Sequence, residues 1–252
     1  MKNTSLQICM AIGLTMVLIS STQAQTTVRA EALNNQGVDL LEAGKFAEAI
    51  ILIQEAIRLR PDYTIAYGNL GAAFYRTGQF PQAIVALKKA IELKSDFAED
   101  YNKLGAIYAE AGRTEEALAP FQRAIRLQPD FAPALYNLGC VYLRLQEFKK
   151  AINSLERAAQ IEPNDASVRC ELGIALSRQK KYRAAITQLQ WAVRLQPHNV
   201  EAQFILGQLH LLNRDPQSAL VQYRKIAELN SQVAQKLYQE IHKDKIVTVS
   251  GK

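Results

Sequence analysis

The chain has 252 residues, of which 48% are hydrophobic and 21% charged, a composition too apolar for an intrinsically disordered protein. Its formal net charge is +6, and Lys243, Lys245 and Lys252 near the C-terminus contribute part of this excess. Elsewhere acidic and basic residues are interleaved, whereas a nucleic-acid-binding protein gathers its Lys and Arg on one face. We therefore expect no nucleic-acid partner.

Residues 1–24 have the layout of a secretory signal peptide. A positive charge at Lys2 precedes a largely apolar run from Leu6 to Ile19, and the small residue Ala24 closes the segment. The run is shorter than the roughly 20 apolar residues that a membrane-spanning helix needs. We expect cleavage after Ala24, export to the periplasm or the extracellular space, and no membrane insertion after cleavage. An uncleaved leader would instead be a membrane anchor. Residues 25–29 are then a short linker.

A period of 34 residues dominates the chain from residue 30 to residue 233. Every copy of the repeat has glycine at its eighth position and alanine at its twentieth, with no insertion or deletion between copies. Such a period is typical of proteins that stack one small structural unit many times. The six copies, numbered one to six below, are residues 30–63, 64–97, 98–131, 132–165, 166–199 and 200–233.

Each copy contains two stretches with helical spacing of apolar residues. In copy four these are Leu135, Leu138 and Tyr142, followed by Ile152 and Leu155. Two short antiparallel helices cannot bury their apolar stripes alone, but stacked neighbours can. The glycine and the alanine are small because helix backbones approach closely there, so a leucine at either position would overpack the crossing.

Two places depart from this simple pattern. Pro120 falls several residues into the second helix of copy three, where we expect a kink or a late helix start. After Val233, Leu237, Tyr238 and Ile241 recur at helical spacing, which predicts a capping helix over residues 234–242. We expect residues 243–252 to form a disordered tail.

The repeat resembles the tetratricopeptide repeat (TPR) family in its period and in a set of fixed residues. In copy three these are Leu104-Gly105, Tyr108, Ala117, Phe121 and Pro129. The resemblance implies an all-α fold, a right-handed α-solenoid of antiparallel helix pairs, here with a C-terminal capping helix. The last two copies depart from the family pattern at Arg169, Gln203, His210 and Ile226.

No catalytic motif or metal-binding cluster stands out. The three histidines lie on different elements, and the sequence has no zinc-protease, hydrolase or phosphate-loop motif. We predict that the protein is not an enzyme and needs no cofactor or metal. Cys140 and Cys170 hold nearby positions in adjacent copies. They either pair as a disulfide, as the exported location would allow, or remain as two buried thiols.

The family resemblance implies that positions 2, 5, 9, 12 and 13 of each copy line a concave groove, with position 6 nearby. Asparagine side chains there can both donate to and accept from a peptide backbone. Aromatic residues at positions 5 and 12 are not required by the stacking of repeats. Position 9 lacks the asparagine of relatives that bind acidic chaperone tails, so we expect a more apolar ligand. The candidate ligand-binding residues are Asn35, Asn69, Tyr75, Arg76, Asn102, Tyr136, Asn137, Leu143, Arg144, Arg178, Phe204 and Leu211.

The expected function is a non-catalytic protein–protein interaction scaffold or assembly factor of the cell envelope, which binds a peptide segment of a partner in the concave groove. One alternative is a self-assembling structural protein, in which the tail or capping helix of one chain occupies the groove of the next. Another is an accessory subunit of an envelope enzyme or of a secretion complex.

Overall fold

The computed structural model describes residues 23–94 and 96–242, and these residues form helices and turns but no strand. The prediction of an all-α fold is therefore confirmed. Residues 1–22 of the expected leader and the expected tail of residues 243–252 lie outside the described residues. The chain divides into two compact units, residues 1–112 (unit 1) and residues 113–252 (unit 2).

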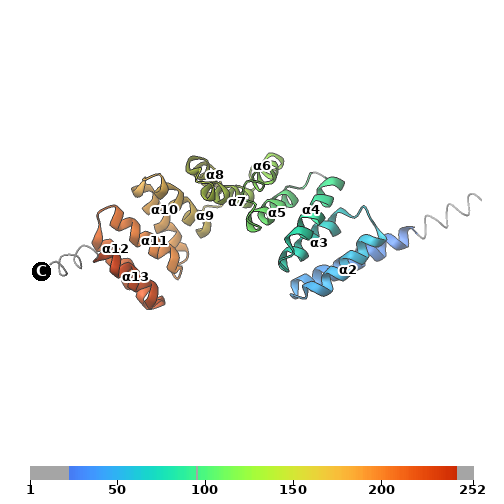
Figure 1. The fold of residues 1–252 in the computed structure, drawn as a ribbon, viewed down its shortest axis with the longest axis horizontal. Helices are drawn as coiled ribbons and strands as arrows, with labels where there is room; N and C mark the ends of the chain where they lie inside the picture. The colour runs from blue at the N-terminus through green and yellow to red at the C-terminus, as the bar shows by residue number, and fades with distance from the viewer. Residues whose placement is uncertain (1–22, 95, 243–252) are drawn as a thin grey trace, which may run out of the picture. The chain divides into compact units, whose positions relative to one another are not determined.

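In unit 1 each helix packs against the next one along the chain (Figure 1). Residues 23–42 are helical, so the expected linker over residues 25–29 is wrong. Residues 25–29 contain no glycine or proline that would end a helix, and the hydroxyls of Thr26 and Thr27 each donate to the carbonyl of Gln23 at 2.9 Å. The helices that follow are α2 (Phe46–Leu59), α3 (Thr64–Arg76), α4 (Phe80–Leu93) and α5 (Ala98–Glu110).

In unit 2 consecutive helices also pack side by side (Figure 1), and the first helices of neighbouring copies touch as well, α7 against α9 and α9 against α11. The helices of this unit are α6 (Leu118–Leu127), α7 (Ala132–Arg144), α8 (Phe148–Ile161), α9 (Ala166–Arg178), α10 (Tyr182–Leu195), α11 (Val200–Leu212), α12 (Pro216–Leu229) and α13 (Ser231–Ile241).

Helix α6 starts late, as Pro120 predicts. It begins at position 21 of its copy, whereas the second helices α2, α4, α8, α10 and α12 all begin at position 17. Residues 114–117 form turns instead. Proline has no N–H to donate to the carbonyl of Glu116, and its ring would clash with that carbonyl in a continuous helix. Pro120 therefore lies in the first turn of α6, where neither problem arises.

The turn between the two helices of a copy has one residue with left-handed backbone, always at position 15. In the first three copies this residue is Gly44, Gly78 or Gly112, with φ between 73° and 75°. In the last three it is Gln146, Lys180 or Arg214, with φ between 59° and 62°. The turn geometry is the same in both groups, although only glycine adopts it without a steric cost.

The small residue at position 8 marks a close helix crossing, as expected. A Cβ atom built on Gly139 would lie 2.5 Å from Cγ of Leu155, at position 24 of the same copy. The equivalent glycines of copies one, two and five meet the side chain at their own position 24 at 2.5–2.7 Å. Gly207 differs, because its nearest neighbour is Leu237 of α13 at 2.6 Å. The capping helix thus fills, in copy six, the space that the second helix fills elsewhere.

Helix α13 begins three residues earlier than expected and covers the last repeat. The side chain of Asn230 accepts hydrogen bonds from the backbone N–H groups of Gln232 and Val233, both at 3.1 Å, and so caps the helix at Ser231. Ala234 and Leu237 are buried, and they form one apolar cluster with Ile226 of α12.

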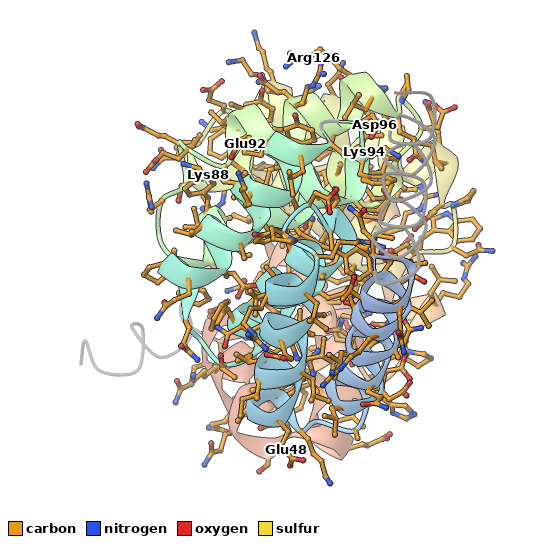
Figure 2. All side chains as sticks on the ribbon, turned by 90° about the vertical axis from the view of Figure 1, so that its right-hand side faces the viewer. Glu48, Lys88, Glu92, Lys94, Asp96 and Arg126 are labelled. Atoms are coloured by element: carbon orange, nitrogen blue, oxygen red, sulfur yellow. The ribbon has the colours of Figure 1, made fainter. Side chains whose placement is uncertain are left out.

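The outward faces of the second helices carry mixed charges. Figure 2 shows Glu48, Lys88 and Glu92 projecting away from the ribbon. Lys89 pairs with Glu92 at 3.1 Å, and both side chains are largely exposed. Exposed pairs of this kind contribute about 0–1 kcal/mol, so they keep the surface soluble rather than hold the fold together.

Candidate functional site

In unit 2 one face of the helices α7, α9 and α11 runs over three consecutive copies. Positions 2, 5, 6, 9, 12 and 13 recur three or four residues apart, so they share one side of a helix. We call the side chains at these positions of α7, α9 and α11 the inner surface. It holds the predicted residues Tyr136, Asn137, Leu143, Arg144, Arg178, Phe204 and Leu211, together with Cys140 and Cys170.

A pocket of about 520 Å³ opens in the inner surface between α9, α11 and α13. Its walls are apolar at Ile174 and Ile205, while Arg178 and Glu201 add charges of opposite sign. Gln208 closes one side, because its Nε2 donates to both carboxylate oxygens of Glu240 at 3.0 and 3.1 Å. Of the predicted residues, Arg178 and Leu211 line this pocket. The complete lining is Ile174, Ser177, Arg178, Glu201, Ile205, Gln208, Leu211, Leu212 and Glu240.

Two half-buried thiols lie on the inner surface. Cys140 and Cys170 are both free, and the Cys140 thiol forms a hydrogen bond with the hydroxyl of Tyr136. Burial and, to a lesser extent, the nearby carboxylate of Glu171 together raise the pKa of each thiol to about 12. Both cysteines are therefore protonated near neutral pH, which makes them poor nucleophiles and poor metal ligands.

A carboxylate next to these thiols is held in an unfavourable environment. Burial raises the pKa of Glu171, and the charge of Glu201 raises it further, while Arg144 acts in the opposite direction. Glu171 is half-buried and the nearby Glu201 is exposed, so a bound N–H group or a basic side chain at this place would be attracted to both carboxylates. The inner surface therefore combines an apolar pocket with an adjacent acceptor of hydrogen bonds.

Two predicted residues of unit 1, Tyr75 and Arg76, contact side chains of neighbouring helices. The hydroxyl of Tyr75 donates to Oε1 of Glu110 at 2.5 Å, and this hydrogen bond is the main cause that raises the pKa of Tyr75 to about 12. The guanidinium of Arg76 lies 5.2 Å from the centre of the Phe46 ring. Both side chains thus help to join neighbouring helices, so less of their surface is available to contact a ligand.

Of the predicted asparagines, one helps to pack the repeats, and the others are exposed or half-buried. Nδ2 of Asn69 donates to Oδ1 of Asn34 at 3.0 Å, and Asn34 is buried. This bond connects the first helices of copies one and two, so Asn69 stabilises the stack. Asn35 is exposed, while Asn102 and Asn137 are half-buried on α5 and α7.

Phe204 and Leu211 have a structural role that the sequence analysis missed. It held that the aromatic residue at position 5 is not required by the stacking of repeats. In copy six, however, both residues pack against the buried cluster of Ile226, Ala234 and Leu237. Their side chains help to hold the capping helix on α11, and Phe204, which is half-buried, remains a predicted ligand contact with this additional packing role.

Several surface residues escaped the sequence analysis although the position rule points to them. Ile174 and Gln208 occupy position 9, Glu171 and Ile205 position 6, and Glu201 position 2. The candidate list took no residue from positions 2 and 9 and only asparagine from position 6, and so excluded them. Glu240 could not be found in this way, because it belongs to the capping helix and has no repeat position.

A second small pocket, of about 240 Å³, lies in unit 1 between α3 and α5. Its lining includes Gly68 and Asp100, and a Cβ atom on Gly68 would lie 3.3 Å from Oδ1 of Asp100. Asp100 is 8% exposed, and burial raises the pKa of its carboxyl group. Among the described residues, Gly68 is a helical glycine without a place in the repeat pattern, and Asp100 is its only close neighbour.

The described residues contain no group of three or more His, Cys, Asp or Glu side chains that could hold a metal ion. His210 lies 3.7 Å from Asp215, but burial lowers its pKa, so it is neutral near pH 7. Over residues 23–94 and 96–242, no helix combines the length and apolar character needed to cross a membrane.

Comparison with known families gives matches along most of the chain. Models of the tetratricopeptide repeat match residues 132–165 and 170–234, and a TPR repeat model matches residues 37–78, 73–112 and 105–146. No curated protein sequence matches the chain.

Solved structures of repeat proteins share the fold. PilF of Pseudomonas aeruginosa has a TM-score of 0.75 at 21% identity, over 86% of this chain and 99% of its own. YrrB, described as a TPR protein with an unusual peptide-binding site, has a TM-score of 0.65 at 23% identity, over 74% and 97%. A chain of the APC/C hetero-tetramer Cut9–Hcn1 has a TM-score of 0.70 at 22% identity, over 84% of this chain. This chain spans 42% of that longer protein.

Proposed function

Because the chain is a tetratricopeptide-repeat protein, and such proteins generally mediate protein–protein interactions, we propose that it is a non-catalytic scaffold that binds a segment of another protein on the inner surface of unit 2. The pocket between α9, α11 and α13 is the observation that carries this proposal. There the partner inserts an apolar side chain between Ile174 and Ile205.

The chemistry of the inner surface supports a segment with both apolar and basic character. Leu212, at the edge of the pocket, is 56% exposed, and exposed apolar side chains beside a pocket are typical of interaction sites. Glu171 and Glu201 offer acceptors to backbone N–H groups or to a basic side chain of the partner. YrrB, which has the same fold, is described as having a peptide-binding site, although not necessarily at this place.

The expected export of the chain leads us to place this scaffold in the cell envelope. If the leader is cleaved after Ala24, the mature protein begins at Gln25. Intact-mass measurement of the protein isolated from the cells that make it tests this. A mass that includes residues 1–24 would contradict cleavage and would make the protein membrane-anchored.

The binding proposal is tested in two steps. A pull-down from the native envelope first identifies the partner. Calorimetry then compares the wild type with the double variant Ile174→Ala and Ile205→Ala. We expect binding to weaken at least about tenfold, or about 1.4 kcal/mol, with unchanged helical content.

The matched control is Val221→Ala combined with Ile161→Ala. Both residues are exposed and apolar, and they lie at the other helices of the same unit, α12 and α8. The control variant should bind like the wild type. The inner surface would be ruled out as the site if the variant with Ile174→Ala and Ile205→Ala bound as tightly as the wild type. It would also be ruled out if the control variant lost as much affinity as that variant.

Self-association is distinguished from this function by the molecular mass in solution. The contacts of α13 described above are made with α11 and α12 of the same chain. A scaffold of this kind should keep the mass of one chain over a wide concentration range in light scattering. A mass that rises with concentration would favour the self-assembling alternative.

A further inference from the structure

The other side of the repeats has a hollow that recurs at identical positions in two copies. In copy two, α3 and α4 enclose about 460 Å³, and in copy four, α7 and α8 with part of α6 enclose about 510 Å³. Positions 4, 7, 11, 18, 19, 22, 23 and 26 line both hollows. The hollow is therefore a product of the helix-pair geometry, and the side chains of each copy decide what it can bind.

The chemistry of the two hollows is opposite in character. At positions 18, 19, 22 and 26, copy two has Pro81, Gln82, Val85 and Lys89. At the same positions, copy four has Lys149, Lys150, Asn153 and Arg157, and Arg126 of α6 adds another cation. We call the hollow of copy four the basic groove.

The basic groove has four cations in its lining and no carboxylate. Two of the cations are already engaged: Lys150 pairs with Glu147, and Nη2 of Arg157 donates to the carbonyl of Pro129 at 3.0 Å. Arg126 and Lys149 have no carboxylate partner among the residues that the structure describes. Arg126 projects outward from the ribbon (Figure 2). Two unpaired cations beside a hollow attract an anionic ligand.

The floor of the basic groove is apolar. Leu135 and Leu138 are buried beneath it, and Tyr142 is 8% exposed, with its hydroxyl 3.3 Å from Nε2 of Gln122. An apolar floor between cationic walls suits an extended chain that alternates acidic and apolar side chains. A free inorganic anion would use the walls only.

We propose that the basic groove is a second binding site, for an acidic segment of a partner protein. It is separate from the inner surface, because Leu135, Leu138 and Tyr142 of α7 line the groove while Tyr136 and Cys140 of the same helix belong to the other face. The C-terminal segment of this chain does not fit the groove, since Lys243, Lys245 and Lys252 give it the wrong charge.

The test uses a fluorescent peptide in which glutamate alternates with leucine, measured by anisotropy against the full-length mature chain. We expect the wild type to bind this peptide and not its lysine–leucine counterpart, with an affinity that falls as salt is added. Reversing two charges, Arg126→Glu with Lys149→Glu, should weaken binding at least about tenfold.

A matched control variant reverses two charges elsewhere on the same unit. Arg183 holds position 18 of copy five, as Lys149 does in copy four, and Arg224 lies on α12; both are exposed. Arg183→Glu with Arg224→Glu changes the net charge by the same amount and should leave binding within about twofold. The variant with Ile174→Ala and Ile205→Ala should also bind the acidic peptide normally.

Three results would overturn the proposal. One is no binding of the acidic peptide by the wild type, and another is an equal loss in both charge-reversed variants. The third is that inorganic phosphate displaces the peptide completely and binds with the same affinity as the peptide. This would mean that the groove holds a small anion without using its apolar floor. Circular dichroism confirms that each variant is folded.

Discussion

At the scale of single residues, position 15 shows how one backbone conformation is reached with different side chains. Copies one to three use glycine, while Gln146, Lys180 and Arg214 adopt the same left-handed backbone in copies four to six. A side chain in this region costs about 1–2 kcal/mol because Cβ approaches the following carbonyl oxygen. Unit 2 therefore carries strain at three turns that unit 1 avoids.

Replacing one of these residues with glycine should stabilise the protein. Gln146→Gly removes the steric cost but makes the unfolded chain more flexible, so we expect a net gain of about 0.5–1 kcal/mol in the free energy of unfolding. Chemical denaturation measures it. Gly78→Ala, at the same position of copy two, should lose a similar amount. If Gln146→Gly were destabilising, the left-handed turn would not be strained.

At position 8 we expect a larger side chain in place of glycine to destabilise the protein, because the space is limited and not because of the backbone conformation. Gly139→Leu should lower the thermal midpoint, because even a Cβ atom would overlap Cγ of Leu155 and overpacking costs about 1–3 kcal/mol or more. Gly68→Ala is the comparison, since its Cβ atom would meet only a carboxylate oxygen at 3.3 Å. A wild-type melting point for Gly139→Leu would disprove the close crossing.

His210 makes the stability of the last repeat depend on pH. Burial lowers its pKa below the ordinary 6.5, and Asp215 only partly opposes this. Between the two pKa values the unfolded chain binds more protons than the folded protein, so stability is lost as the pH falls through 6.5. His210→Phe supplies the aromatic side chain found at this position in copies two to four and cannot titrate.

The measurement is the difference in melting temperature between His210→Phe and the wild type at pH 7.5 and at pH 5.5, above and below the ordinary histidine pKa of 6.5. We expect the advantage of the variant to be larger at the lower pH. A difference that stays constant would show that His210 keeps its ordinary pKa in the folded protein.

At the scale of elements, the capping helix places one large, fully buried side chain against the last repeat. Leu237 is fully buried against Gly207 and Ile226, so Leu237→Ala should cost about 2–5 kcal/mol. Tyr238→Ala, on the same helix but 40% exposed, should cost less. Denaturation of the two variants tests this. Equal losses would mean that α13 does not cover the last repeat in solution.

The helices could largely be predicted from the sequence, because the 34-residue period and the spacing of apolar residues both depend on local geometry. Pro120 is a good example: it predicts a kink or a late helix start, and α6 starts late. The linker over residues 25–29 was wrong because the repeat boundary was taken as the helix boundary. Nothing in that stretch ends a helix.

The candidate site was less predictable because it depends on what lies next to each position. A rule taken from the repeat assumes another repeat on both sides, and copy six has α13 instead. Phe204 and Leu211 therefore pack partly against the capping helix, while Glu240 enters the pocket from outside the repeat. Copy six does depart from the repeat pattern, for example at Ile226, but such a departure does not by itself say which element lies next to it.

At the scale of the whole molecule, both proposed surfaces lie on unit 2 and share α7. One side of this helix contributes Tyr136 and Cys140 to the inner surface, and the other side contributes Leu135 and Tyr142 to the basic groove. A scaffold with two such sites can hold two segments at once, and two linked segments bind more tightly than either alone.

The contact between Gly207 and Leu237 determines where a further repeat can be inserted into this protein. Copies one, two, four and five each fill the space over their own glycine from position 24, but copy six has Tyr223 there, and this ring stacks on Tyr238 at 5.3 Å. A duplicated copy inserted before residue 200 would find a complementary neighbour on each side. One inserted after residue 233 would separate Gly207 from Leu237 and leave a void that Tyr223 does not fill. Repeats can therefore be added or removed between existing copies but not between copy six and the capping helix. Longer or shorter scaffolds should be engineered at the internal copies.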